Sequence, residues 1–124
     1  MHDQPSVSEL VEAVKNFIDR TAAPNLQGHA AFHARVASNV LATVLRDLEQ
    51  RPDAEADEKA RLLKLLSASE DQTVEALNAA LSARIKSGDV TSETPGLLAH
   101  LKTTTIAQVE IDQPRYSGLK AAKD

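Results

Sequence analysis

The chain has 124 residues and no cysteine, a length that favours a single compact domain. The absence of thiols excludes disulfides, thiolate metal sites and cysteine nucleophiles, and it fits a reducing compartment, so a cytoplasmic location is expected. Acidic residues number 18 against 14 lysines and arginines. Because no basic cluster is interleaved with aromatic residues, nucleic acid is not an expected partner. Neither a signal peptide nor an apolar membrane span is recognisable, so neither export nor membrane insertion is expected.

The sequence predicts an all-α fold, an antiparallel bundle of about five helices. Its only aromatic residues are Phe17, Phe32 and Tyr116, so the core must be built from Leu, Val, Ile and Ala, which suits close helix packing. Apolar residues recur at helical spacing up to about Asp112. We therefore expect one helical-bundle domain over residues 1–112, followed by a C-terminal tail over residues 113–124.

The first predicted helix begins with a capping box, in which Ser6 is the N-cap and Glu9 stands three residues later. It carries one apolar stripe and ends at Pro24. The second runs from about residue 28 to 51, because the residue before Pro52 is pushed out of the helical region. Its apolar residues span an arc of about 220°, which implies neighbours on two sides. The stripe comprises Leu10, Val14, Phe17 and Ile18, and the arc comprises Phe32, Val36, Val40, Leu41, Val44, Leu45 and Leu48.

Three further helices are predicted. Asp53 can cap a helix over residues 54–67, a second spans residues 70–87 before Gly88, and Thr94 followed by Pro95 begins the last, which ends near residue 112. Expected inward-facing residues are Leu62, Leu63 and Leu66, then Val74, Leu77, Leu81 and Ile85. The tail loses this periodicity and is expected to fray.

No nucleotide-binding loop, zinc-protease motif, hydrolase elbow or calcium loop is present in the sequence. Their absence favours a protein that is not an enzyme, although scattered side chains can also form an active site. His29 and His33 are four residues apart on the apolar arc. They suit satisfied core or capping histidines, or an interface contact, better than a metal site, because no third ligand stands nearby. No metal site and no cofactor are therefore expected.

Several other polar residues are candidates for binding or interface roles. Arg35 and Asn39 stack at the edge of the arc, where an arginine either covers apolar surface or contacts an anion or a partner protein. In the last helix Thr105, Gln108 and Asp112 share a side with apolar residues. They either pair across the bundle with His33, Asn39 or Asn78, or are covered by another chain. Arg115 and Tyr116 either cap the bundle or form a protein-binding hot spot.

The chain also resembles a small bacterial family of similar length. The resemblance rests on the stretches Ala31–Leu41, Leu77–Ile85, Leu97–Leu101 and Pro114–Tyr116, of which the first is the most specific. Members of that family are encoded beside aminoglycoside-phosphotransferase-like kinases and acyl-CoA dehydrogenases. The resemblance implies an accessory subunit of a kinase that phosphorylates a 4-hydroxyacyl-CoA in levulinic-acid-type catabolism. Two positions depart from the family pattern: Ser38 replaces an expected alanine, and Gln113 replaces an expected asparagine.

Three functional hypotheses follow. The first is a non-catalytic partner of such a kinase, acting in acyl-CoA metabolism. The second is a small stand-alone ligand-binding protein or enzyme with a site around His33, Arg35, Asn39 and Asp112. The third, compatible with both, is a homo-oligomer in which the apolar arc packs against its own copy by two-fold symmetry.

Overall fold

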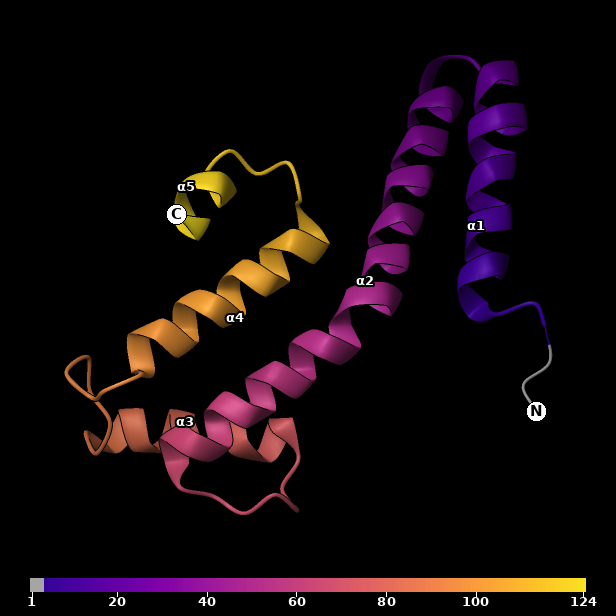
Figure 1. Ribbon diagram of the computed structural model, residues 1–124. Coiled ribbons are helices and arrows are strands. Elements are labelled where there is room, and N and C mark those ends of the chain that lie inside the picture. Colours follow the sequence, from indigo (N-terminus) through magenta and orange to yellow (C-terminus); the bar gives the residue numbers. More distant parts are fainter. Residues whose placement is uncertain (1–3) are drawn as a thin grey trace. The chain divides into compact units, whose positions relative to one another are not determined.

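The computed structural model describes residues 4–124, and within that range it contains helices and no strand (Figure 1). The all-α prediction is therefore confirmed. The chain divides into two compact units, residues 1–50 and residues 51–124, and each is described by itself. The α-helices are α1 (Val7–Phe17), α2 (Gly28–Leu66), α3 (Val74–Ser87), α4 (Leu97–Asp112) and α5 (Leu119–Lys123). None of them is both long enough and apolar enough to cross a membrane.

The predicted capping box begins α1. The Ser6 hydroxyl accepts a hydrogen bond from the Glu9 N–H at 3.2 Å, and the Ser6 N–H donates to the Glu9 carboxylate at 2.7 Å. These two bonds satisfy donors that a helix start leaves unpaired. The Ser6 backbone N–H, and after it the Ser6 side chain, hold the pKa of the Glu9 carboxyl below its ordinary value. After α1 the helix widens into a π turn over Ile18–Ala22 and then tightens into a 3₁₀ turn over Ala23–Asn25.

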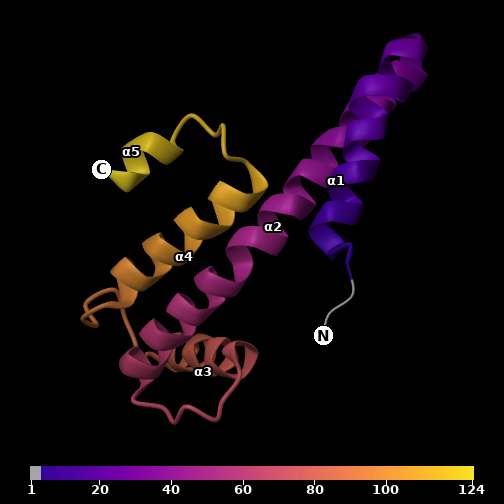
Figure 2. The same ribbon diagram turned by 45° about the vertical axis from the view of Figure 1, so that its right-hand side comes forward.

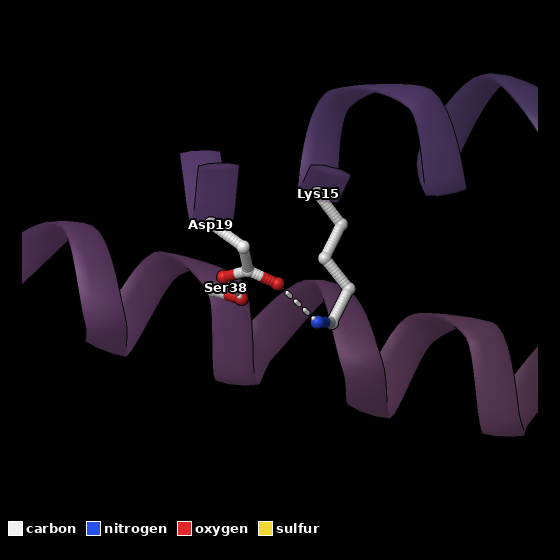
Figure 3. Close-up of polar contacts among 3 residues, drawn as sticks. All are labelled: Lys15, Asp19 and Ser38. Atoms are coloured by element: carbon white, nitrogen blue, oxygen red, sulfur yellow. Dashed lines mark hydrogen bonds and ion pairs between the residues drawn. The ribbon is translucent and has the colours of Figure 1, made fainter. Parts of the chain in front are cut away.

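In the first unit, α1 and the N-terminal half of α2 lie side by side and run in opposite directions (Figures 1 and 2). One polar cluster joins them (Figure 3). The Lys15 ammonium donates to the Asp19 carboxylate at 2.6 Å, and the Ser38 hydroxyl of α2 donates to the other oxygen of that carboxylate. Lys15 first, and Ser38 second, hold the pKa of Asp19 below its ordinary value. The Ser38 hydroxyl thus ties the two helices together.

The predicted break at Arg51 is wrong, because α2 continues through Pro52 to Leu66. Proline removes one backbone N–H and crowds the carbonyl of residue 48, but the flanking residues keep the helical path. The segment expected to be a separate helix capped by Asp53 is the C-terminal part of α2. Five α-helices still result because residues 119–123 form α5, where an aperiodic tail was expected.

The second unit contains the hydrophobic core. Leu62 and Leu66 of α2 pack with Leu77 and Leu81 of α3, as the sequence predicted, and all four are buried. Val90 and Leu97 complete the cluster. Ile85, which was expected in the same seam, is instead exposed. Helix α4 runs antiparallel to the C-terminal part of α2, with Gly96 beside Leu65 and the Arg61 guanidinium donating to the Thr104 hydroxyl at 3.2 Å.

The helix ends in this unit are only partly those expected. Gly88 ends α3 in the left-handed conformation, with a φ of 85°, which confirms its predicted role. Helix α3 begins at Val74 after a Thr73 cap, not at residue 70. Helix α4 begins at Leu97 after Gly96, not at Thr94, whose hydroxyl instead accepts a hydrogen bond from the Thr91 N–H at 2.9 Å. Thr94 therefore closes the preceding turn and does not cap α4.

Candidate functional site

A continuous apolar line runs along the N-terminal half of α2. Its members are four residues apart, so each lies one turn above the last, and all are exposed. Phe32 and Val40 are exposed to 57% and 56%. At 1.5 Å per residue the line is about 24 Å long. We call this line, made of Phe32, Val36, Val40, Val44 and Leu48, the α2 ridge.

The α2 ridge lies on the side of α2 that faces away from α1. Ser38 is buried and contacts Asp19 on the α1 side. Val40 is two residues further, and at 3.6 residues per turn it points to nearly the opposite side of the helix. The wide arc predicted neighbours on two sides of this segment. Within residues 4–50, α1 supplies one of them, and the ridge is the other apolar side.

Helix α1 presents a second exposed apolar stripe. Val7 and Phe17 are exposed to 63% and 59%, and Leu10 and Val14 lie between them at the spacing of a coiled-coil seam. Among residues 4–50 no apolar side chain is buried. Scattered surface apolar residues are ordinary, but contiguous ones mark interaction surfaces. The first unit therefore carries two contiguous exposed apolar surfaces.

Residues 28–46 of α2 carry charge of one sign, and the carboxylates of Asp47 and Glu49 follow at the C-terminal end of the α2 ridge. The sequence from Gly28 to Arg46 contains no Asp or Glu, whereas it contains Arg35, Arg46 and two histidines. The helix N-terminus adds partial positive charge to this segment.

The three candidates on α2 are all exposed but do not face one way. The rings of His33 and Phe32 meet edge to face, with 5.5 Å between their centroids, so His33 borders the α2 ridge. Arg35 is two residues beyond His33 and points to the other side of the helix, together with Asn39 one turn later. His29 and His33 are exposed, so they are not core histidines. His33 therefore lies beside the α2 ridge, whereas Arg35 and Asn39 lie on a different side of the helix.

The candidates in the second unit pair locally. The Asn78 amide donates to the Glu58 carboxylate at 2.8 Å. The Gln108 amide donates to Asp112 on its own helix at 2.7 Å, and its carbonyl oxygen accepts from Arg51 at 3.4 Å. Gln108 and Asp112 are exposed, so their face of α4 is polar surface. Because Gln108 and Asp112 are exposed, they do not need the hydrogen-bond network across the bundle that was predicted for a buried face.

Arg115 and Tyr116 line an open hollow of about 540 Å³ at the C-terminal end of the chain. Lys120 and Lys123 of α5 line the same hollow, and Lys123 forms an ion pair with Glu110 of α4. The two residues predicted as a bundle cap or a hot spot therefore share this hollow with two lysines and with Asp124. The Tyr116 side chain is 57% exposed.

One polar residue that sequence reasoning did not select is His100, in the first turn and a half of α4. It is only 3% exposed, and among residues 4–124 its Nδ1 has no hydrogen-bond partner. Burial, and after it the neighbouring Arg61 guanidinium, lower the pKa of His100, while Glu58 acts in the opposite direction. A useful signal in the sequence was its position three residues after the buried Leu97, which places it on the inner side of α4.

The lowered pKa of His100 predicts that acid weakens the fold. Above the ordinary histidine pKa of 6.5 the imidazole is neutral in both the folded and the unfolded chain, so stability is complete. As the pH falls below that value, the unfolded chain takes up a proton that the folded chain resists, and stability is lost. We expect a lower urea midpoint at pH 5.5 than at pH 7.5. An NMR titration of His100 with a pKa at or above 6.5 would contradict this assignment.

Comparison with known proteins gives one match. A family model described as Domain of unknown function (DUF6285) matches residues 24–116, which is most of the chain. The α2 ridge and the whole of α4 lie inside the matched segment, whereas α1 lies outside it. The comparisons with curated proteins and with solved structures found no match.

Proposed function

The chain belongs to the family of the domain of unknown function DUF6285, and we propose that it is a non-catalytic accessory subunit of an aminoglycoside-phosphotransferase-like kinase. As the resemblance implies, that kinase would phosphorylate the hydroxyl group of a hydroxyacyl-CoA in short-chain acid catabolism. One observation carries the proposal: the α2 ridge is a long, exposed apolar surface on a unit that buries no apolar side chain within residues 4–50.

The ridge has the properties of a helix that docks onto another protein. Its residues repeat every four positions, the spacing that forms ridges on a helix surface and fits the grooves of a facing helix. Phe32 is the large aromatic anchor, with His33 packed against its edge. Phe32 stands at the N-terminal end of the ridge, and aromatic residues are enriched in protein interfaces.

Charge favours a different protein over a second copy of this chain. Residues 28–46 contain basic residues and no carboxylate, so over this length a second copy of the segment would bring like charge and no opposite charge to it. A kinase surface with carboxylates beside an apolar groove would avoid that repulsion. The proposal therefore commits to the kinase as the occupant of the ridge.

The test is to co-express the chain with the proposed partner, an aminoglycoside-phosphotransferase-like kinase from the same organism, and to compare the wild type with Val40→Glu. Val40 is more than half exposed, so the new carboxylate leaves the fold intact but is buried uncompensated in the complex. We expect co-purification to be lost, with the affinity for the kinase reduced by at least about tenfold. Phosphorylation of a hydroxyacyl-CoA by the kinase should depend on the wild-type chain and fall with the variant.

Ser82→Glu is the matched control, since it adds the same charge at an exposed position on α3. It should co-purify with the kinase as the wild type does. The proposal fails if the kinase is fully active alone, or if Val40→Glu and Ser82→Glu behave identically. It also fails if size-exclusion chromatography with light scattering shows a dimer that only Val40→Glu dissociates while kinase activity is unchanged, because the ridge would then bind its own copy.

A further inference from the structure

Little buried apolar surface holds α1 to the N-terminal half of α2. Within residues 4–50 Ser38 is the only buried residue. Val11 of α1 and Ile18, which directly follows α1, are only partly buried. Because hydrophobic stabilisation grows with the apolar area removed from water, this helix pair gains little from it. The attachment of α1 therefore depends strongly on its polar contacts.

These polar contacts meet at the Asp19 carboxylate (Figure 3). Lys15 and Asp19 both precede the turn between the helices, so their ion pair does not join α1 to α2. The Ser38 hydroxyl, which donates to Asp19, is the member of this cluster that comes from α2. The Asp19 side chain is 40% exposed. Water can therefore replace Ser38 as its hydrogen-bond partner when the helices separate, and no buried charge is left without a partner.

The segment between α1 and α2 has the backbone freedom that such a separation needs. Leu26 is extended, and Gly28, the first residue of α2, has a φ of 58°. Glycine adopts this left-handed conformation and others at little cost, and a side chain at position 28 would meet open space. A change of the backbone dihedral angles at residues 26–28 is therefore enough to carry α1 away from α2.

We propose that α1 is a releasable strap, held to α2 by the hydrogen bond between Ser38 and Asp19, that separates from α2 at residues 26–28 while the second unit stays folded. Leu41 and Leu45 stand three and seven residues after Ser38, so they lie on the same side of α2. Both are partly buried while the strap is closed. Release exposes this second apolar side, so the strap controls how much of α2 a partner can contact. The inference does not depend on which protein binds the α2 ridge.

The test is native-state hydrogen exchange of the full-length protein, followed by NMR at low urea concentrations. An isolated helix of 11 residues is marginal in water, so the amides of α1 exchange once the strap is released. We expect them to exchange at least about tenfold faster than the amides of Leu62 and Leu77 in the core. Their exchange should also depend less on urea, because release exposes less surface than global unfolding does.

Leu77→Val distinguishes release of the strap from global unfolding. It deletes one methylene group from a fully buried side chain of the second unit, so the chain stays folded while the core amides exchange about fivefold faster. The second unit is folded both before and after release, so exchange of the α1 amides should not change. Equal acceleration of the two sets of amides overturns the proposal, because α1 would then open only when the whole chain unfolds.

Ser38→Ala removes the hydrogen bond that holds the strap. The α1 amides should exchange about tenfold faster, as expected for the loss of a hydrogen bond to a charged group. Ser8→Ala is the matched control, because it makes the same substitution at an exposed position of α1, and it should cause no acceleration. If the two variants behave alike, the bond between Ser38 and Asp19 does not hold the strap and the proposal fails.

Gly28→Ala tests the turn. Alanine is strained at a φ of 58° only while the strap is closed, so this variant should speed exchange of the α1 amides by about fivefold. Unchanged exchange would overturn the assignment of residues 26–28 as the point of separation. None of these measurements involves the kinase, so their failure and the failure of the accessory-subunit proposal are distinguishable.

Discussion

Replacing Leu77 by alanine should lower the free energy of unfolding by about 2–5 kcal/mol, the range for truncating a fully buried leucine. Leu77 is 0% exposed and packs in the cluster that joins α2, α3 and the start of α4. That cluster contains only six buried residues, so few neighbours are available to fill the space left behind. Because a domain of this size is stable by about 5–15 kcal/mol, the loss is a large part of the total.

Equilibrium urea unfolding followed by circular dichroism measures this loss as a lower midpoint. Leu98→Ala is the matched control, since it deletes the same atoms from a side chain that is 61% exposed, and it should change stability by less than about 0.5 kcal/mol. Similar losses for the two variants would mean that Leu77 does not lie in the core. A changed dependence on urea concentration would point to loss of two-state unfolding.

The features that sequence alone predicted are those fixed by local chemistry. The capping box at Ser6 and Glu9 needs only residues three apart, and the left-handed end at Gly88 needs only a residue without a side chain. The buried seam of Leu77 and Leu81 follows from helical spacing alone. The all-α class follows from the same periodicity.

The features that sequence missed depend on which surfaces meet. Ile85 has the right spacing for the seam, but it extends past the residues that α2 covers and is exposed. The four residues of the apolar stripe predicted for the first helix differ in exposure. Ile18 is partly buried, whereas Leu10, Val14 and Phe17 are exposed. Periodicity reports which residues are apolar, not whether a neighbour is present to cover them.

In the candidate site, too, the sequence predicted what local spacing determines and missed what depends on contacts between helices. Periodicity identified the apolar arc of the second helix, and the structure separates it into a side toward α1 and the exposed α2 ridge. His33 and Arg35 were grouped because they are close in sequence, although two residues along a helix point in nearly opposite directions. His100 was missed because Arg61, the charge beside it, comes from a different helix, and no local pattern joins the two residues.

The last prediction concerns Pro52, where sequence reasoning placed a helix end and the structure places a continuous helix. Proline has no N–H to donate to the carbonyl of Leu48, and its ring crowds that carbonyl, so a proline inside a helix costs about 3 kcal/mol relative to alanine. Pro52→Ala should restore this hydrogen bond. Part of the gain is offset because alanine makes the unfolded chain more flexible, by about 0.4–1 kcal/mol. We therefore expect a net stabilisation of about 2 kcal/mol.

Hydrogen exchange of the backbone amides in residues 49–56 measures this effect directly, since the variant adds an amide at position 52 and should slow exchange on either side of it. Asp53→Ala is the control, because it changes the neighbouring exposed side chain and leaves every backbone donor in place. A rise in the urea midpoint with Pro52→Ala and none with Asp53→Ala would show that Pro52 weakens a helix that the surrounding sequence already specifies. A fall would mean that the path of α2 through this turn requires the proline, and that straightening it strains one of the two units that α2 joins.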